Sequence, residues 1–301
     1  MRIFWKFFII VGFYLNSLLI FNLFADDELS AEGYNTIRIE NEFKLFVPLD
    51  KIDEIWTYLT MRYLNLEQFF LKQYDVNFRT EFSTEYFTDT YYDNSTRDML
   101  KNENGLRRRL RIMPESPEHK KNGRILIQLK LKRNKDLVTN RSEIKFPVDK
   151  KYRGNVSKNI SLWTLIKSDK YRKEFVERLK DLKIDYRTVR PMFDLHQERK
   201  RIYVYLGDDP FATITLDTIT VQKWWKTVRF SEIEMELNEI KYSNADIVKR
   251  SNMQKVNNII KNDLTDKFPY IKQDQLPKYN KAYNILEKEI PMFSFLLWLT
   301  G

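Results

Sequence analysis

Polar and apolar residues alternate with a period of two along much of the chain, which is typical of β-strands with two different faces. Seven segments show this alternation: residues 36–47, 106–113, 124–132, 140–148, 198–206, 211–221 and 228–237. Three further segments space their apolar residues as amphipathic helices do: residues 50–72, 168–181 and 243–264. Asp50 and Ser168 are the expected N-caps of the first two helices. Because no repeat or linker divides residues 34–290, the pattern predicts one domain of the α+β class.

One face of most of these strands is charged, and the charges are sorted by sign. Residues 107–111 place three arginines on one face, whereas residues 232–236 place three glutamates on another. A single strand of this kind would be an ordinary amphipathic strand, but solvated faces usually mix both signs. Sorted charges on several strands predict that the charged faces turn inward around a channel for an anion and its metal. The expected fold is a closed eight-stranded antiparallel β-barrel with helices packed outside.

The composition narrows the chemistry that such a channel can carry. The 301 residues include no Cys, which excludes disulfides, Cys-based zinc sites, iron–sulfur clusters and a thiol nucleophile. Only two His are present, which leaves little room for a His-rich metal centre or a His-dependent triad. The net charge of +10 admits nucleic acid, anionic lipid or polyphosphate as partners. What remains is chemistry based on carboxylates, on Lys and Arg, or on metals with oxygen ligands.

The N-terminus carries the pattern of an export signal. Arg2 and Lys6 precede an uncharged run over residues 7–25, and Asp26 follows at once. A basic start, an apolar middle and an acidic exit are typical of a signal peptide or a signal anchor, here residues 1–25. The alternative is a buried helix of the main fold. Both export interpretations place the domain outside the cytoplasm, either periplasmic or secreted, or anchored to a membrane.

The C-terminal residues 291–301 form an apolar tail. Its central part, residues 291–299 with the sequence PMFSFLLWL, is too short to span a membrane. We expect this tail to pack on the domain, and a peripheral contact with a membrane is the alternative.

An ordered series of motifs lies on the same charged strands. The motifs are Glu40-Asn41-Glu42-Phe43-Lys44, Thr90-Tyr91-Tyr92-Asp93, Leu106-Arg107-Arg108-Arg109, Lys130 with Lys132, Arg141-Ser142-Glu143, Val189-Arg190-Pro191, Ile214-Thr215-Leu216-Asp217-Thr218, Glu232-Ile233-Glu234-Met235-Glu236 and Pro277-Lys278-Tyr279. In this order they resemble the CYTH superfamily of triphosphate tunnel metalloenzymes, and within it the VTC polyphosphate-polymerase domain. The resemblance covers residues 37–287 and implies a closed barrel that binds a triphosphate and a divalent cation. The first motif, ExExK, is weak by itself, because it occurs by chance in many charged chains.

Two departures from the VTC pattern leave the activity open. VTC polymerases lack the full ExExK that residues 40–44 contain, and they carry Lys where this chain has Glu236. At both places the chain looks like the hydrolytic CYTH enzymes instead. Its middle therefore resembles a polymerase and its metal-binding ends resemble a triphosphatase.

The charged residues of these motifs are the expected site residues. A phosphoanhydride chain needs several cations that point into one space, and clustered carboxylates favour Mg²⁺ or Mn²⁺. The expected metal ligands are Glu40, Glu42, Asp217, Glu232 and Glu234. Glu42 or Glu236 is expected to be catalytic by orienting the attacking water. The expected substrate-binding residues are Lys44, Arg107, Arg109, Lys130, Lys132, Arg141, Arg199, Arg201 and Lys278.

Three functions remain after this reasoning. The leading hypothesis is a metal-dependent phosphohydrolase that acts on triphosphate, polyphosphate or a nucleoside triphosphate. Its nearest rival is a VTC-like polyphosphate polymerase that uses ATP, and a rival of another class is a non-catalytic polyanion-binding protein. Adenylate cyclase and RNA-capping triphosphatase activities also occur in the wider superfamily. Nucleic acid is not the expected partner, because the Tyr-rich strands are interpreted as barrel wall rather than as a base-stacking platform.

Overall fold

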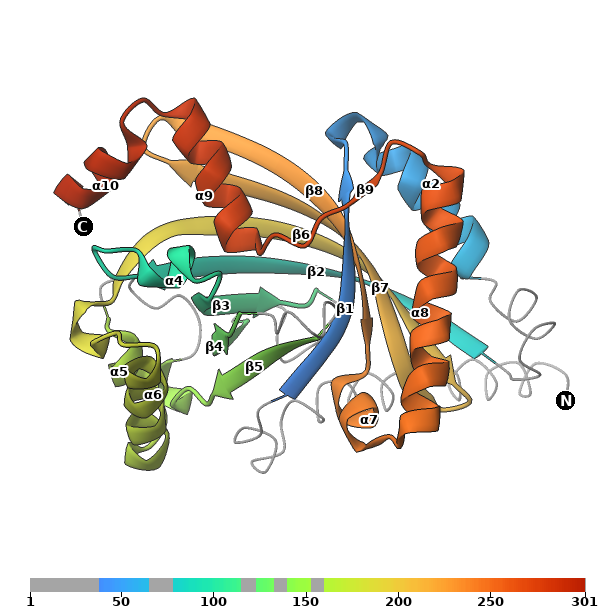
Figure 1. Ribbon diagram of the computed structural model, residues 1–301, viewed down its shortest axis with the longest axis horizontal. Helices are drawn as coiled ribbons and strands as arrows, with labels where there is room; N and C mark the ends of the chain where they lie inside the picture. Colours follow the sequence, from blue (N-terminus) through green and yellow to red (C-terminus); the bar gives the residue numbers. More distant parts are fainter. Residues whose placement is uncertain (1–37, 65–77, 115–122, 133–139, 153–159, 301) are drawn as a thin grey trace, which may run out of the picture. The chain divides into compact units, whose positions relative to one another are not determined.

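Nine antiparallel strands form the sheet that organises the chain (Figure 1). The computed structural model describes residues 38–64, 78–114, 123–132, 140–152 and 160–300, all of which belong to one unit. The signal or anchor predicted for residues 1–25 and the first residues of the predicted domain, 34–37, lie outside these ranges. Both therefore stay predictions.

The strands follow one another as hairpins over most of the sheet. They are β1 (Arg38–Val47), β2 (Phe78–Asp93), β3 (Gly105–Ile112), β4 (Arg124–Lys130), β5 (Asn140–Phe146), β6 (Arg190–Leu206), β7 (Asp209–Lys223), β8 (Lys226–Leu237) and β9 (Lys272–Gln273). Their order is β5-β4-β3-β2-β6-β7-β8-β1-β9. Two pairings join distant parts of the chain, because β2 lies beside β6 and β1 lies beside β8.

β1 also pairs with β5, at the far end of this strand order. Four residues of β1 lie opposite β5, with Glu40 opposite Arg141. The next six lie opposite β8, with Glu42 opposite Glu236. One strand therefore brings the charged faces of β5 and β8 together.

The seven predicted strands are present and the α+β class is confirmed, but the predicted number of eight strands is wrong. The described residues form nine strands, which include β9 and the long β2. Period two is hard to see in β2 because its outer face mixes Phe82 and Tyr86 with threonines. Its inner face mixes Glu85 with Phe87. The missed strand supplies part of the site.

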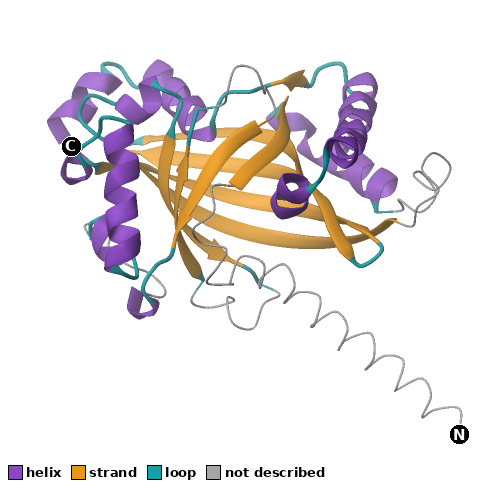
Figure 2. Ribbon diagram, turned by 60° about the horizontal axis from the view of Figure 1, so that its bottom comes forward, coloured by secondary structure: helices purple, strands orange, loops and turns teal. Residues whose placement is uncertain are grey.

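Helices cover the outward faces of the strands in two groups, which Figure 2 shows at opposite ends of the sheet. The α-helices are α2 (Ile52–Tyr63), α4 (Asp98–Lys101), α5 (Leu162–Leu165), α6 (Asp169–Asp181), α7 (Glu239–Asn244), α8 (Ile247–Lys267), α9 (Lys278–Glu289) and α10 (Phe293–Thr300). Short 3₁₀ turns lie at Leu49–Lys51, Lys150–Tyr152 and Tyr186–Thr188.

Two apolar clusters hold these helices on the sheet. In one, Leu59 of α2 and Ile260 of α8 pack with Leu45 of β1. In the other, Phe175 of α6 and Leu286 of α9 belong to the cluster that contains the apolar residues of β4. Each fully buried side chain of this size contributes about 1.5–3 kcal/mol. Because helices cover the apolar faces of the strands, the charged faces lie on the opposite, inward side of the sheet.

The three predicted helices are present, and two of them, α2 and α8, start later than predicted. α2 begins at Ile52 after a 3₁₀ turn that contains Asp50, so the prediction of Asp50 as its N-cap is wrong. Ser168 does occupy the N-cap position of α6, although its side chain makes no capping hydrogen bond. α8 begins at Ile247, and the side chain of Asp246 accepts from the backbone N–H of Lys249. The acidic cap fixes the start of α8 four residues later than the apolar spacing indicates.

The apolar tail forms helix α10 and packs on the domain along one side. Phe293 is 1% exposed and Leu297 is 7% exposed, and both belong to the cluster around β4. Among the helices in the described ranges, none has the length and apolar character that crossing a membrane requires.

Candidate active site: a charged interior

The inward faces of the strands bring a large set of ionisable side chains into one interior. These side chains form three groups with different balances of charge. The arginine group is Arg107, Arg109, Arg111 and Arg201 with Glu85 and Asp89. The lysine-filled cluster is Asp217, Glu232 and Glu234 with Lys44, Arg199 and Lys278. The glutamate cluster is Glu40, Glu42, Glu143, Glu236 and Glu239 with Lys130 and Lys145.

In the arginine group, Asp89 of β2 is held by two arginines of β3. Arg109 forms a two-pronged contact with it, since its Nε and Nη2 atoms each lie 2.7 Å from a carboxylate oxygen. Nη1 of Arg107 lies 3.1 Å from the same carboxylate. Burial alone would raise the pKa of Asp89, but the two guanidinium groups lower it to about 2. The carboxylate is therefore charged at neutral pH.

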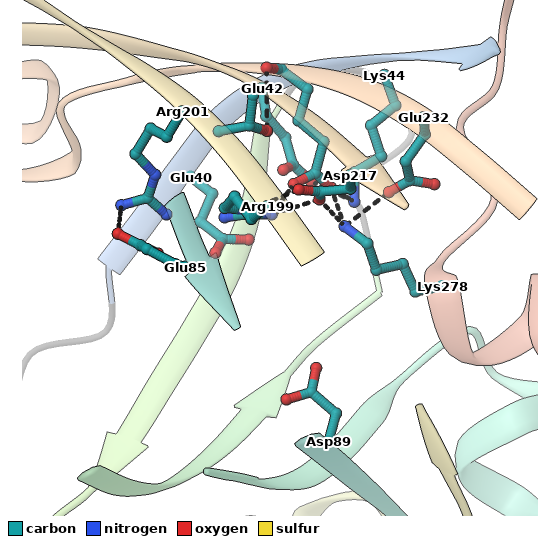
Figure 3. Close-up of polar contacts among 12 residues, drawn as sticks. Glu40, Glu42, Lys44, Glu85, Asp89, Arg199, Arg201, Asp217, Glu232 and Lys278 are labelled. Carbon is teal, nitrogen blue, oxygen red and sulfur yellow. Dashed lines mark hydrogen bonds and ion pairs between the residues drawn. The ribbon is translucent and has the colours of Figure 1, made fainter. Parts of the chain in front are cut away.

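Glu85, which lies on the same face of β2 as Asp89, contacts residues of two other strands. Its Oε1 atom accepts from Arg111 of β3 at 2.8 Å and from the Tyr203 hydroxyl of β6 at 3.0 Å. Arg201 of β6 lies 3.2 Å from the same oxygen, as Figure 3 shows. Burial opposes ionisation, yet these arginines lower the pKa of Glu85 to about 2.

The arginine group has more positive than negative charge. Four guanidinium groups share two carboxylates, so the group has a formal excess of two positive charges. Phe87 lies among them, and the guanidinium carbon of Arg109 is 4.1 Å from the centre of its ring. Opposite Phe87, Gln197 is 2% exposed, and neither of its amide atoms has a hydrogen-bond partner among the described residues. Since buried polar atoms are normally paired, this lining suits a polar, anionic ligand.

In the lysine-filled cluster, an ammonium group lies among three carboxylates (Figure 3). Lys278 of α9 places Nζ 2.9 Å from Asp217, 2.7 Å from Glu232 and 2.8 Å from Glu234. Arg199 of β6 holds both oxygens of Asp217 at 2.7 and 2.6 Å, and it reaches Glu234 at 2.6 Å. The predicted metal ligands of β7 and β8 therefore do lie together, but a lysine lies where a metal was expected.

The lysine-filled cluster is balanced. Its three carboxylates meet Lys278, Arg199 and Lys44, which lies 2.7 Å from Glu234, and Lys281, shared with Asp274, reaches Glu232 at 2.6 Å. Burial would raise the pKa of Glu234, but Lys278, Lys44 and Arg199 hold it well below its usual value. The pKa of Lys278 is correspondingly raised, against the effect of burial, by the three carboxylates. The carboxylates of this cluster are therefore compensated by cations of the chain itself.

In the glutamate cluster, carboxylates outnumber cations. One oxygen each from Glu40 of β1, Glu143 of β5 and Glu239 of α7 lie within 4.8 Å of one another. Lys130 contacts Glu40 at 2.6 and 2.8 Å, and Lys145 lies 3.2 Å from Glu143 and 3.6 Å from Glu239.

Two further glutamates, Glu42 and Glu236, lie directly opposite each other on β1 and β8. Among the described residues, five carboxylates face Lys130 and Lys145, and Glu42 also lies 3.3 Å from Lys44, which the lysine-filled cluster shares, so carboxylates outnumber ammonium groups. Burial and then Glu143 raise the pKa of Glu40 to about 7. Burial, Glu40 and Glu239 raise the pKa of Glu236 well above its usual value. Raised values of this kind mark carboxylates that lack enough positive charge nearby.

The glutamate cluster fits a divalent cation on two further grounds. The Oε1 atom of Glu143, a residue that is 2% exposed, has no hydrogen-bond partner among the described residues. The nearest cations to it are Lys130 at 3.7 Å and Arg107 at 3.8 Å. All of the donors are carboxylate oxygens, which suit Mg²⁺ or Mn²⁺ rather than zinc.

Most residues predicted for the site reach this interior. They are Glu40, Glu42, Lys44, Arg107, Arg109, Lys130, Arg199, Arg201, Asp217, Glu232, Glu234, Glu236 and Lys278. Lys132 does not join them: β4 ends at Lys130, and Lys132 is exposed, with its backbone N–H bonded to Asn104. The prediction for Lys132 was wrong because it extended the alternation of β4 beyond Lys130, where the strand ends. Arg141 lies opposite Glu40 in the backbone ladder, and its side chain lies outside the described parts.

Several interior residues were not among the predicted site residues. They are Glu85, Asp89, Arg111, Glu143, Lys145, Glu239 and Lys281. Arg111 and Glu143 share alternating faces with predicted residues, so the pattern itself could have identified them. Glu85 and Asp89 lie on the strand whose alternation is unclear, and Glu239 lies on a short helix after β8.

Asp93, which ends the Y-x-D motif, has a structural role outside the interior. Its carboxylate accepts from the backbone N–H groups of Met99 and Leu100, each at 3.0 Å. It also accepts from the Tyr279 hydroxyl at 2.9 Å. Asp93 therefore ties β2 to α4 and to the first turn of α9.

Comparisons with known proteins give similarity without an assignment. No protein-family model matches the chain, and no curated protein matches it. A solved candidate adenylate cyclase from Bacillus halodurans shares 16% identity and a TM-score of 0.47, over 83% of this chain and 98% of that one. A Pyrococcus horikoshii protein shares 17% and 0.42, over 83% and 99% of the two chains. A candidate adenylyl cyclase from Hippeastrum with a dominant triphosphatase activity shares 13% and 0.45, over 85% and 99%. At such values the similarities assign neither a family nor an activity to this chain.

Proposed function

We propose that the chain is a metal-dependent enzyme that hydrolyses phosphoanhydride bonds in inorganic triphosphate, polyphosphate or a nucleoside triphosphate. The observation that carries this proposal is the separation of charge in one interior. The arginine group, in which guanidinium groups outnumber carboxylates, adjoins the glutamate cluster, in which the described carboxylates outnumber the cations. Nη2 of Arg107 lies 3.8 Å from Oε1 of Glu143, where the two groups meet. A metal–polyphosphate complex has the complementary distribution of charge.

The pairing of β1 with β5 supports a tunnel as the shape of this interior. If that pairing closes eight strands into a ring, the charged faces of all eight line one enclosed space. A dry, enclosed space strengthens each contact between guanidinium and phosphate, since fewer waters compete for the oxygens. Closure of this kind is part of the proposal, together with the resemblance to triphosphate tunnel enzymes.

The chain's own residues would bind, orient and neutralise the substrate. Glu40, Glu143 and Glu239 would hold the Mg²⁺ or Mn²⁺, with Glu42 and Glu236 beside them. When bound, this cation polarises the terminal phosphoryl group and draws its charge toward the glutamates.

The arginine group would hold the following phosphoryl oxygens, and in-line transfer gains most from such fixed positive charge. Glu42 and Glu236 lie opposite each other on adjacent strands, so either could orient the attacking water.

A phosphate-release assay with tripolyphosphate and Mn²⁺ tests this proposal. We expect turnover in the unaltered chain and a loss of about 10–100-fold or more in Glu40→Gln. Arg201→Gln should raise KM with a smaller effect on kcat, because Glu85 keeps Arg111 as its partner. Lys132→Gln is the matched control, since this lysine is exposed outside the interior, and it should leave turnover unchanged. Absence of turnover in the unaltered chain with tripolyphosphate, polyphosphate and ATP, or full turnover in Glu40→Gln, contradicts the proposal.

A polyphosphate polymerase is the second candidate, because two of the VTC-like segments meet in the interior. Asp217 of the Leu-Asp-Thr segment lies 2.9 Å from Lys278 of the Pro-Lys-Tyr segment. Incubation with ATP, followed by gel detection of long phosphate chains, separates the two activities. Long chains favour the polymerase, and free phosphate without chains favours the hydrolase. Binding that survives removal of the metal, without either product, favours a polyanion-binding protein.

A further inference from the structure

Two turns near the C-terminal end of the described unit hold large apolar residues in a left-handed backbone conformation. Trp224 has a φ of 52° in the two-residue turn between β7 and β8, and Met292 has a φ of 56° between α9 and α10. Turns of this kind normally carry Gly or Asn, and a bulky residue there is uncommon. Trp225, the second residue of the first turn, is 70% exposed, and Met292 is 67% exposed. Strained positions that present apolar side chains to solvent often mark a surface with a function.

Direct contacts place these two turns on one surface. The ring of Trp224 stacks on Trp225 with centroids 5.9 Å apart, and it meets the ring of Phe293 edge-on at 5.7 Å. Phe293 is the first residue of α10. Figures 1 and 2 both place α10 and the C-terminus at one end of the unit, away from α2 and α8.

α10 is apolar on the side that faces away from the domain as well. Phe293 and Leu297 fill the core, whereas Phe295 and Leu299 are 47% and 57% exposed. These two are four residues apart, so they lie on the same side of the helix. We name Trp225, Met292, Phe295 and Leu299 the α10 surface. Its apolar residues are contributed by three elements of the chain, and α10 itself has no charged residue.

Lysines border the α10 surface. Lys223 and Lys226 flank the tryptophan turn, and Lys288 is exposed at the end of α9. The two nearby glutamates are engaged, since Glu289 lies 2.7 Å from Lys226 and Glu287 accepts from Ser294 at 2.7 Å. Lys226 is thus paired and Lys223 donates to the Met192 carbonyl at 2.6 Å, and three lysines against two glutamates leave the border with a formal excess of one positive charge. An apolar patch with Trp at its edge and Lys around it suits a bilayer interface whose headgroups are anionic.

We propose that the α10 surface docks on the interface of an anionic lipid bilayer. Phe295 and Leu299 would enter the acyl boundary, Trp225 would lie at the headgroup level, and Lys226 and Lys288 would face the phosphates. The α10 helix has eight residues, so the contact is peripheral rather than spanning. This inference does not depend on the chemistry of the charged interior.

A single fluorescent probe tests the inference in the full chain. The chain has no Cys, so Leu299→Cys gives one labelling position for an environment-sensitive NBD probe. We expect a blue shift, and quenching by brominated lipid, with vesicles that contain three parts phosphatidylglycerol to seven parts phosphatidylcholine. Vesicles of phosphatidylcholine alone should give a weaker response. Because the probe reports only its own surroundings, attachment through another part of the chain does not imitate this result.

Matched variants keep the test decisive. Ile247→Cys is the control label, because Ile247 is 85% exposed on α8, and its probe should not respond. Trp225→Ser in the labelled chain should weaken the apparent affinity by about tenfold. Lys288→Glu should reduce the dependence on phosphatidylglycerol. An unchanged Leu299 probe in all vesicles overturns the inference. A blue shift that instead follows protein concentration without lipid also overturns it, since a second copy of the chain would then cover this surface.

Discussion

Two groups of carboxylates in one interior look alike until their cations are counted. Asp217, Glu232 and Glu234 are as closely gathered as Glu40, Glu143 and Glu239. The first three meet at least as many cations as carboxylates, and the pKa of Glu234 is held low. The second three belong to a group with too few cations, and the pKa of Glu40 rises to about 7. Proximity of carboxylates is therefore common to both groups, and the balance of nearby positive charge is what distinguishes them.

The difference has its origin in which element faces each group. α9 directs Lys278 and Lys281 toward β7 and β8, and each of these lysines contacts Glu232. β1 and β8 instead place Glu42 opposite Glu236, an arrangement in which like charges repel across neighbouring strands. The lysines of α9 thus provide ion-pair partners for the carboxylates of β7 and β8.

Removing the ammonium group from the lysine-filled cluster should have the largest effect. Lys278→Met leaves three buried carboxylates with fewer cations, and it should lower the free energy of unfolding by about 3–5 kcal/mol. Urea unfolding in the presence of EDTA measures this loss. Mn²⁺ should restore part of the stability and bind as one additional equivalent in a titration, because the vacated position becomes a cation site. Unchanged stability of the variant would remove the distinction between the two clusters.

The second largest effect should be the pH dependence of the free energy of unfolding in the absence of metal. Glu40 has its ordinary pKa near 4.5 when unfolded and about 7 when folded, so the folded chain binds more protons between these values. Its contribution is therefore full below about pH 4.5 and is lost as the pH rises through 7, by about 1–3 kcal/mol. Urea unfolding at pH 5 and pH 8 in EDTA measures this change.

Glu85 and Asp89 provide the internal reference for this measurement. Their pKa values are lowered to about 2, so their contribution is lost only as the pH falls below their ordinary values toward 2. Glu40→Gln should reduce the slope between pH 5 and pH 8 and leave the acid limb as it was, and Glu236, whose pKa is also raised, accounts for any slope that remains. An unchanged slope in this variant would assign the effect to another group.

The next smaller effect should be on the affinity for metal, which we expect to differ between variants of the two clusters. Glu143→Gln should weaken Mn²⁺ binding by about 10–100-fold, whereas Asp217→Asn should change it little. Isothermal titration at constant pH measures both affinities, and circular dichroism checks that each variant is folded. The reverse order of effects would place the metal in the lysine-filled cluster, whose carboxylates the sequence predicts as ligands together with Glu40 and Glu42.

The contact that orients α9 should give the smallest effect. Tyr279→Phe removes the hydroxyl that donates to Asp93 and should cost about 0.5–1.5 kcal/mol in thermal unfolding. Tyr283→Phe is the comparison variant, because its hydroxyl contacts Ser294 and Glu287 near α10 instead. Neither variant should change Mn²⁺ binding, because neither hydroxyl contacts the glutamate cluster, and an altered affinity in Tyr279→Phe would show that the two clusters are coupled.

The sequence was sufficient for much of this architecture because period two and charge sorting are local properties. They located seven strands and most of the interior residues, including Arg107 and Glu234. They failed at β2, where Tyr and Phe occur on both faces. They also failed at Lys132, since nothing in the local pattern indicates that β4 ends at Lys130.

The charge balance of each cluster could not be predicted from such patterns. Whether Asp217 or Glu40 lacks a cation depends on α9, which follows β8 by some forty residues in the printed sequence. Glu239 reaches the interior from a short helix, and its position depends on the turn after β8. Partners that come from distant elements are properties of the folded chain rather than of any segment.

The hydrogen bond from Tyr279 to Asp93 has a consequence for the energetics of the interior. Asp93 is itself fixed by two backbone N–H groups at the start of α4, so Tyr279 is attached to a rigid point. The lysine that precedes this tyrosine is thus ordered when the chain folds, and the entropy of its long side chain is lost at that stage. A ligand that enters the interior meets a pre-organised ammonium group and has less ordering to cause on binding. The hydrogen bond between Tyr279 and Asp93 can in this way influence how tightly the interior binds a ligand, although neither residue contacts that ligand.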